Sequence, residues 1–156
     1  MQKQTPEDLN LIIEKIQNYC SYSERCLIDV HAKLSTWNLR ENTKEKIIKG
    51  LIHDNFISEA RYAKSFANGK FKINRWGKNK ILYGLRKKQI PDIYIQIALN
   101  DIDREEYIST IKEIILTKFT KILQSKEVVK KNQAMKYLYS RGFETSIVSE
   151  ILNTYE

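Results

Sequence analysis

The sequence predicts an all-α protein made of three tandem three-helix repeats, the third of them shortened. Only five Gly and two Pro occur in 156 residues, too few for the many turns of an all-β sandwich or for a Pro-rich linker. No segment alternates apolar and polar residues with a period of two for long enough to form a strand. Apolar residues instead recur at spacings of three and four, which is typical of amphipathic helices.

The first helices are indicated by their N-terminal residues. Thr5 is a suitable N-cap before Pro6, and the apolar stripe that follows predicts a helix to about Tyr19. Ser21 or Ser23 can cap a second helix, whose apolar stripe contains Leu27, Val30, His31 and Leu34.

Two more helices complete the first half of the chain. The third begins at about Asn42 or Thr43, and its apolar residues are Ile47, Ile48 and Leu51. Ser58 can cap the fourth, which ends where Asn68 and Gly69 weaken the helical pattern.

The second half repeats this plan with five helices. One covers residues 76–88, and the next begins with Pro91 in its first turn. Asp103 and Glu106 form a capping box before a long helix. A helix over residues 130–141 ends at Gly142, a C′ glycine, and the last runs from Thr145 to about Asn153.

Three segments superpose with offsets of 51 and 53 residues. Each has an apolar residue, then Leu four residues later, then another apolar residue five residues after that: Val30, Leu34 and Leu39; Ile81, Leu85 and Ile90; Ala134, Leu138 and Phe143. We therefore predict an N-terminal helix and three repeats, divided as residues 1–20, 21–70, 71–124 and 125–156. Stacked repeats predict an elongated rod, either straight or curved.

Positive charge is concentrated in one part of the chain. The net charge is +8, yet no Asp or Glu occurs from Ala60 to Pro91, where ten Lys and Arg residues lie. The other residues comprise 17 basic and 19 acidic ones, a net charge of −2. Such a block favours contact with phosphate or with an acidic protein surface. A solvated basic face without a partner is the alternative.

Recognisable catalytic chemistry is absent from the sequence. His31 and His53 are the only histidines and have no metal-ligand spacing, and no phosphate-loop or nucleophile motif occurs. We expect no enzyme activity, no metal and no cofactor; an enzyme with an unrecognised site is the weaker alternative. The polar N-terminus, the free thiols of Cys20 and Cys26 and the absence of a long apolar run predict a cytoplasmic protein without a membrane segment.

Four short motifs resemble the RecX family of bacterial recombination regulators. They are Asn55-Phe56-Ile57, Arg61-Tyr62-Ala63, Arg75-Trp76-Gly77 and Lys80-Ile81. The chain departs from the family pattern at Ser58-Glu59, where the family has an acidic pair, and at Lys80, where it has Arg.

The resemblance covers nearly all of the chain from Ser23 onward and implies three tandem three-helix repeats. It also implies a non-enzymatic modulator of the RecA recombinase, which lodges in the groove of the RecA filament on DNA. Such a protein limits filament growth, or ATP hydrolysis and strand exchange, during DNA repair and the SOS response. We expect a monomer that meets DNA within that complex. A helical DNA-binding protein that acts without RecA is the alternative.

The basic block supplies the candidate contact residues, for RecA, for DNA or for both. They are Lys70, Lys72, Arg75, Lys78, Lys80, Arg86, Lys87 and Lys88. Three aromatic residues lie among these charges and are expected either to stack on bases or to pack between repeats. They are Phe71, Trp76 and Tyr83.

Overall fold

The computed structural model describes residues 5–121 and 127–154, and within these ranges the chain forms nine α-helices and no strand. The helices are α1 (Pro6–Tyr22), α2 (Leu27–Ser35), α3 (Glu41–His53), α4 (Glu59–Lys72), α5 (Lys78–Lys87), α6 (Asp92–Asn100), α7 (Arg104–Lys121), α8 (Glu127–Ser140) and α9 (Thr145–Leu152). The predicted all-α class is confirmed. None of the described helices is long and apolar enough to cross a membrane.

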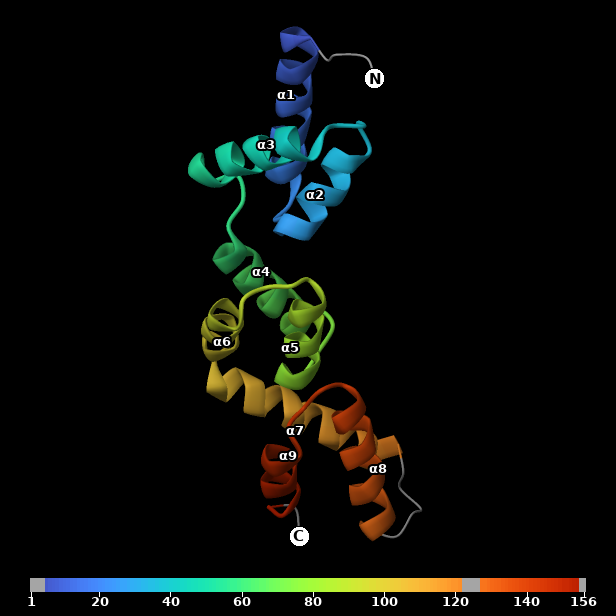
Figure 1. Ribbon diagram of the computed structural model, residues 1–156. Coiled ribbons are helices and arrows are strands. Elements are labelled where there is room, and N and C mark those ends of the chain that lie inside the picture. The colour runs from blue at the N-terminus through green and yellow to red at the C-terminus, as the bar shows by residue number, and fades with distance from the viewer. Residues whose placement is uncertain (1–4, 122–126, 155–156) are drawn as a thin grey trace.

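The helices pack in threes that follow one another along an elongated molecule (Figure 1). Helices α1–α3 form the first unit, α4–α6 the second and α7–α9 the third. The predicted divisions after residues 20, 70 and 124 begin each repeat one helix later, and the last of them lies outside the described residues. A periodic chain can be divided at any helix, so these divisions stay a prediction.

The backbone follows the repeat register found in the sequence. Asn38, Gln89 and Gly142 all have positive φ, at 53°, 56° and 94°. They lie 51 and 53 residues apart, each just beyond the second helix of its unit. A left-handed residue at this point reverses the chain after a helix, and glycine adopts it without strain. The prediction that Gly142 ends a helix is confirmed.

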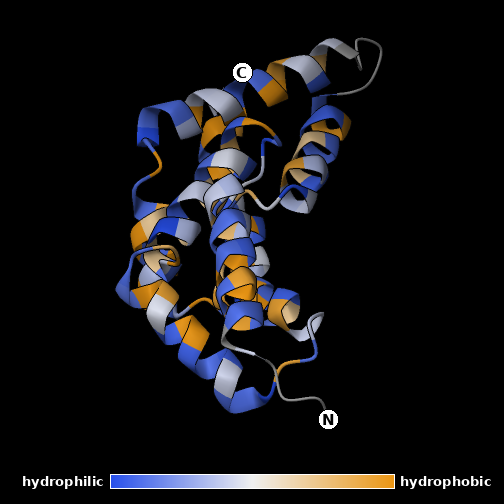
Figure 2. Cartoon of the chain, turned by 90° about the horizontal axis from the view of Figure 1, so that it is seen from above, coloured by the Kyte–Doolittle hydropathy of each residue, from blue (hydrophilic) through white to orange (hydrophobic). Residues whose placement is uncertain are grey.

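The hydrophobic core has two parts of unequal extent. The first unit has its own cluster, with Ile16, Val30 and Leu34 fully buried. A second cluster runs through the second and third units, from Tyr62 to Leu152, and also includes Cys26 of the first unit, with Ile28 of α2 packed against it. Figure 2 shows hydrophobic and hydrophilic residues alternating around the helices, as expected when each helix buries one face.

Several helix ends differ from the sequence predictions. Helix α1 continues to Tyr22, so α2 is preceded by Cys26 and not capped by Ser21 or Ser23. Helix α5 begins at Lys78, two residues later than predicted, because Gly77 is its N-cap. The prediction for Ser58 is confirmed, since its side chain accepts a hydrogen bond from the N–H of Arg61 at 3.2 Å.

Candidate functional site

The basic block lies on α4, on α5 and on the loop between them, and it does not form one continuous face. Its cations fall into groups that meet different neighbours. Four of the ten pair with a carboxylate: Arg61 with Glu24, Arg75 with Glu113, Arg86 with Asp92, and Lys88 with Asp29.

Two of the predicted lysines contact the ring of Trp76. The ammonium groups of Lys70 and Lys80 lie 4.8 and 4.6 Å from its ring centroid. The indole is half-buried and meets the edge of Phe66 at 6.3 Å between ring centroids. Gly84 leaves room for this pair, because a Cβ there would come within 2.8 Å of Phe66. Trp76 thus packs within the second unit and makes a cation–π contact with each of two lysines.

The N-terminus of α5 is fixed to the turn between α8 and α9. The N–H groups of Gly77 and Asn79 donate to the carbonyls of Arg141 and Gly142 at 2.8 and 2.9 Å. A Cβ on Gly77 would overlap the backbone of Gly142. The two segments of the chain can therefore approach each other only because both positions are glycine. The close approach at Gly77 joins the second and third units through their backbones.

Tyr107 of α7 closes the same junction. Its hydroxyl accepts a hydrogen bond from the N–H of Lys78 at 3.0 Å and donates one to the carboxylate of Glu144. Burial, together with the bond to Glu144, raises the pKa of this phenol. The phenol therefore stays protonated and serves as a donor at neutral pH.

Arg75 belongs to a small cationic pocket at this junction. The pocket has a volume of about 210 Å³, and Lys118 of α7 and Arg141 of the α8–α9 turn also line it. The guanidinium of Arg141 donates to the carbonyl of Asn74, and the Lys118 ammonium lies 4.0 Å from the ring centroid of Tyr137. Lys118 and Arg141 are not among the contact residues predicted from the sequence. The repeat offset of 53 residues, which relates Arg141 to Lys88, is a signal that could have found Arg141.

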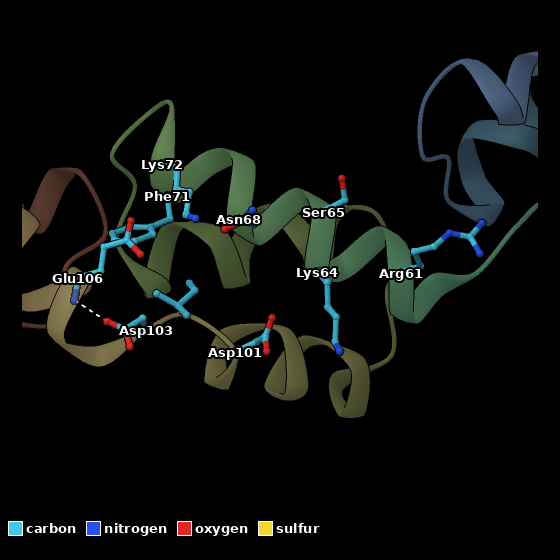
Figure 3. Close-up of a pocket in the computed structure, with 10 residues that line it drawn as sticks. Arg61, Lys64, Ser65, Asn68, Phe71, Lys72, Asp101, Asp103 and Glu106 are labelled. Carbon is cyan, nitrogen blue, oxygen red and sulfur yellow. Dashed lines mark hydrogen bonds between the residues drawn. The ribbon is translucent and has the colours of Figure 1, made fainter.

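Lys72 lies in a separate groove of mixed charge, shown in Figure 3. Basic side chains of α4, including Arg61 and Lys64, line one wall, while Asp101, Asp103 and Glu106 line the other. The groove has a volume of about 440 Å³. Acidic side chains disfavour a phosphate here, so Lys72 does not share an anionic ligand with Arg75.

The C-terminal end of α5 carries the remaining predicted residues. Lys87 lies 4.6 Å from the ring centroid of Tyr83, whose side chain is 62% exposed and open to stacking. Phe71, by contrast, is buried against Tyr107, with 5.6 Å between ring centroids. Of the two roles considered for Phe71, only packing between units is compatible with this burial.

Lys88 reaches back to the first unit. Its ammonium donates to Asp29 of α2 at 2.8 Å. Burial alone would raise the pKa of Asp29, but hydrogen bonds from Lys88 and Cys26 outweigh it and hold that pKa below its ordinary value. The same contact raises the pKa of Lys88. The pair therefore remains ionised and links α2 to α5.

Comparison with known proteins places these helices in a family. Residues 58–99, which contain α4, α5 and almost all of α6, match the model of the RecX second three-helix domain. The chain is 33% identical over 128 residues to Regulatory protein RecX of Clostridium acetobutylicum, covering 80% of this chain and 59% of that protein. The chain belongs to the RecX family. It is also 30% identical over 126 residues to Regulatory protein RecX of Clostridium tetani, covering 80% of this chain and 57% of that protein.

The RecX fold extends over the whole described chain. A crystal structure of RecX from Lactobacillus salivarius superposes with a TM-score of 0.88, covering 96% of this chain and 97% of the other at 23% identity. The chain spans 59% and 57% of the two clostridial relatives. The family resemblance expected from the four sequence motifs is confirmed, and the family is one of regulatory proteins.

Within the described residues, no group of three or more His, Cys, Asp or Glu side chains is arranged to hold a metal ion. His31 contacts Glu41 at 3.3 Å and His53 contacts Asp54 at 3.1 Å, both on exposed parts of the first unit.

Proposed function

We propose that this chain regulates recombinational DNA repair by binding the RecA filament on DNA and limiting its ATP hydrolysis and strand exchange. Membership of the RecX family is the observation that carries the proposal. We further propose that it acts as a monomer in the cytoplasm and has no catalytic activity of its own.

The shape and charge of the molecule support this role. Three units in a row extend along one direction, so one molecule can contact several subunits of a filament (Figure 1). The ten cations of residues 60–91 give its middle part an affinity for phosphate or for acidic protein surfaces.

A titration of the DNA-dependent ATPase of the cognate RecA tests the proposal. We expect inhibition at fewer than one molecule of this protein per RecA subunit, and weaker inhibition at 300 mM than at 50 mM salt. No change in ATPase or strand exchange at equimolar protein would contradict the proposal.

A matched pair of variants tests the basic surface. Lys70→Glu with Lys80→Glu reverses the two cations beside Trp76, and we expect it to weaken inhibition. Lys49→Glu with Lys112→Glu makes the same change in net charge at two exposed positions on α3 and α7. Equal inhibition by both double variants would remove the cations beside Trp76 from the contact surface.

The alternative function, DNA binding without RecA, rests on the cations that have no carboxylate partner. Its mark would be tight binding to bare DNA together with an unchanged RecA ATPase. Fluorescence anisotropy with a labelled oligonucleotide, run beside the ATPase titration, separates the two functions.

A further inference from the structure

The junction between the first and second units contains an ion pair that the next junction cannot form. Asp29 and Lys80 are equivalent, since each is the third residue of its helix, α2 or α5. Lys88 and Arg141 are equivalent as well, since each precedes the left-handed residue of its turn, Gln89 or Gly142. The pair Asp29–Lys88 therefore corresponds to Lys80 and Arg141, which are both cations.

The backbone segments that carry these two residues lie close together in the folded chain. The backbone of Lys80 packs directly against Gly142, next to Arg141. Without a carboxylate in the position of Asp29, the guanidinium of Arg141 turns to the carbonyl of Asn74. A neutral carbonyl accepts a hydrogen bond but does not cancel the charge of Arg141.

Further charges around the junction do not compensate this excess. Arg75 and Lys118 line the pocket with Arg141, so three cations meet there, while the ammonium of Lys80 lies 4.6 Å from the ring centroid of Trp76. Two carboxylates lie near them. Glu113 pairs with Arg75 at 3.0 Å, but both side chains are more than half exposed, so this pair contributes little. The carboxylate of Glu144 accepts a hydrogen bond from the hydroxyl of Tyr107, so it is already part of the contact between the two units.

We propose that the junction of the second and third units is a phosphate-binding site for a nucleic-acid backbone, formed by Arg75, Lys118 and Arg141. The two guanidinium groups suit the oxygens of a phosphodiester, which they can contact in bidentate fashion. A pocket of about 210 Å³ accommodates a single small anionic group. The site deepens the proposed function, on which it rests for the identity of the nucleic acid: the DNA of the filament.

The repeat itself suggests the decisive variant, Lys80→Asp. It places in α5 the residue type that α2 carries at Asp29, so the carboxylate can neutralise Arg141 in place of a phosphate. An acidic residue in the first turn of a helix is favourable, and we expect the fold to be retained, with the melting temperature within a few degrees of the wild type.

DNA binding is measured by anisotropy of a labelled single-stranded oligonucleotide over a series of salt concentrations. Each lost phosphate contact reduces the slope of log K against log salt by about 0.7. We expect Lys80→Asp to reduce it by about 0.7, because the new carboxylate neutralises Arg141. Lys112→Gln, an exposed lysine on the same helix as Lys118, is the control and should leave the slope unchanged.

Two more variants keep the inference testable if Lys80→Asp disturbs the fold. Arg75→Asn removes a charge while keeping a residue type that tolerates the positive φ of 53° at this position, and should reduce the slope by about 0.7. Glu113→Gln removes the carboxylate beside Arg75 and should tighten DNA binding, an effect that a purely structural role would not produce.

The outcomes separate this inference from the proposed function. A wild-type slope in both Lys80→Asp and Arg75→Asn would overturn the phosphate site, whatever the effect on RecA. Unchanged DNA binding with lost RecA inhibition would also overturn it, because the junction would then contact an acidic protein surface. A reduced slope in a protein that leaves the RecA ATPase unchanged would support the site and contradict the proposed function.

Discussion

The two junctions of the molecule are held by different interactions. Between the first and second units, side chains make the contacts. The carboxylate of Glu59 accepts a hydrogen bond from the N–H of Leu27 at 2.8 Å, and the ammonium of Lys88 donates one to Asp29. Between the second and third units, backbone groups of Gly77 and Asn79 donate directly to the α8–α9 turn. One hydrophobic cluster spans the second junction, whereas the first unit has a core of its own and contributes only Cys26, with Ile28 packed beside it, to that cluster.

The first junction therefore has mainly polar side-chain contacts and little shared core, whereas the second junction has an extensive shared core. Side-chain contacts at a partly exposed boundary are weak and sensitive to salt and pH. A shared apolar core and paired backbone groups are lost only when both units open together. We therefore expect the second and third units to unfold as one body and the first unit to open separately.

The largest effect is expected from a matched pair of cavities. Ile16 and Ile111 are both fully buried, the former in the core of the first unit and the latter in the shared core. Replacing either by Ala should cost about 2 to 5 kcal/mol. Ile16→Ala should speed amide hydrogen exchange in α1–α3 only, and Ile111→Ala throughout α4–α9.

Mass-spectrometric hydrogen exchange gives the readout for both variants. Faster exchange over the whole chain in Ile16→Ala would mean that the first junction transmits unfolding as well as the second does. The distinction between the two junctions would then be wrong.

The backbone contact at the second junction gives the next prediction. Gly77→Ala should destabilise the protein by about 3 kcal/mol, because the new Cβ would overlap the backbone of Gly142. Gly50→Ala is the control, since no atom lies within 4 Å of a Cβ there. It should stabilise α3 by about 0.5 to 1 kcal/mol. Urea unfolding followed by circular dichroism measures both, and equal changes would contradict the close approach.

The sequence was sufficient for the helices and for the register that relates them. The spacing of Leu34, Leu85 and Leu138 depends on which helix face is buried, and all three side chains are fully buried. Which helix begins each three-helix unit could not be predicted, because the sequence pattern is the same whichever helix is taken as the first.

The grouping of the basic residues was also beyond the sequence. Lys72 and Arg75 are only three residues apart in the sequence. Because α4 ends at Lys72, however, Lys72 lines the mixed-charge groove and Arg75 lines the junction pocket. Arg141 reaches the same pocket from a distant segment. Only the packing of the third unit on the second brings it there.

A hydroxyl at the second junction should have an intermediate effect. Tyr107→Phe removes the acceptor of the Lys78 N–H and the donor to Glu144, leaving two partly buried groups without their partner. We expect a loss of about 1.5 kcal/mol in urea unfolding and faster exchange of the Lys78 amide. Tyr139→Phe, at a position 67% exposed, should change stability by less than about 0.5 kcal/mol. Equal losses in the two variants would remove Tyr107 from the junction.

The ion pair of the first junction should have the smallest effect on stability. The side chain of Asp29 is 19% exposed and that of Lys88 is 39% exposed, so solvent screens part of their attraction. A double-mutant cycle of Asp29→Asn and Lys88→Gln should give a coupling energy of about 0.5 to 1 kcal/mol. The exposed pair Arg86–Asp92, at 3.4 Å, is the matched control and should couple by only about 0.2 kcal/mol.

The pH dependence of this pair follows from the direction of the Asp29 shift. Because the pKa of Asp29 is lower in the folded state than its ordinary value of 3.8, its stabilisation is complete above that value. It disappears as the pH falls through the folded pKa. Asp29→Asn should therefore lower stability at pH 7 but not at pH 2, and hydrogen exchange should place the change in α1–α3. An equal loss at both pH values would mean that Asp29 acts through packing and that charge does not hold the first unit in place.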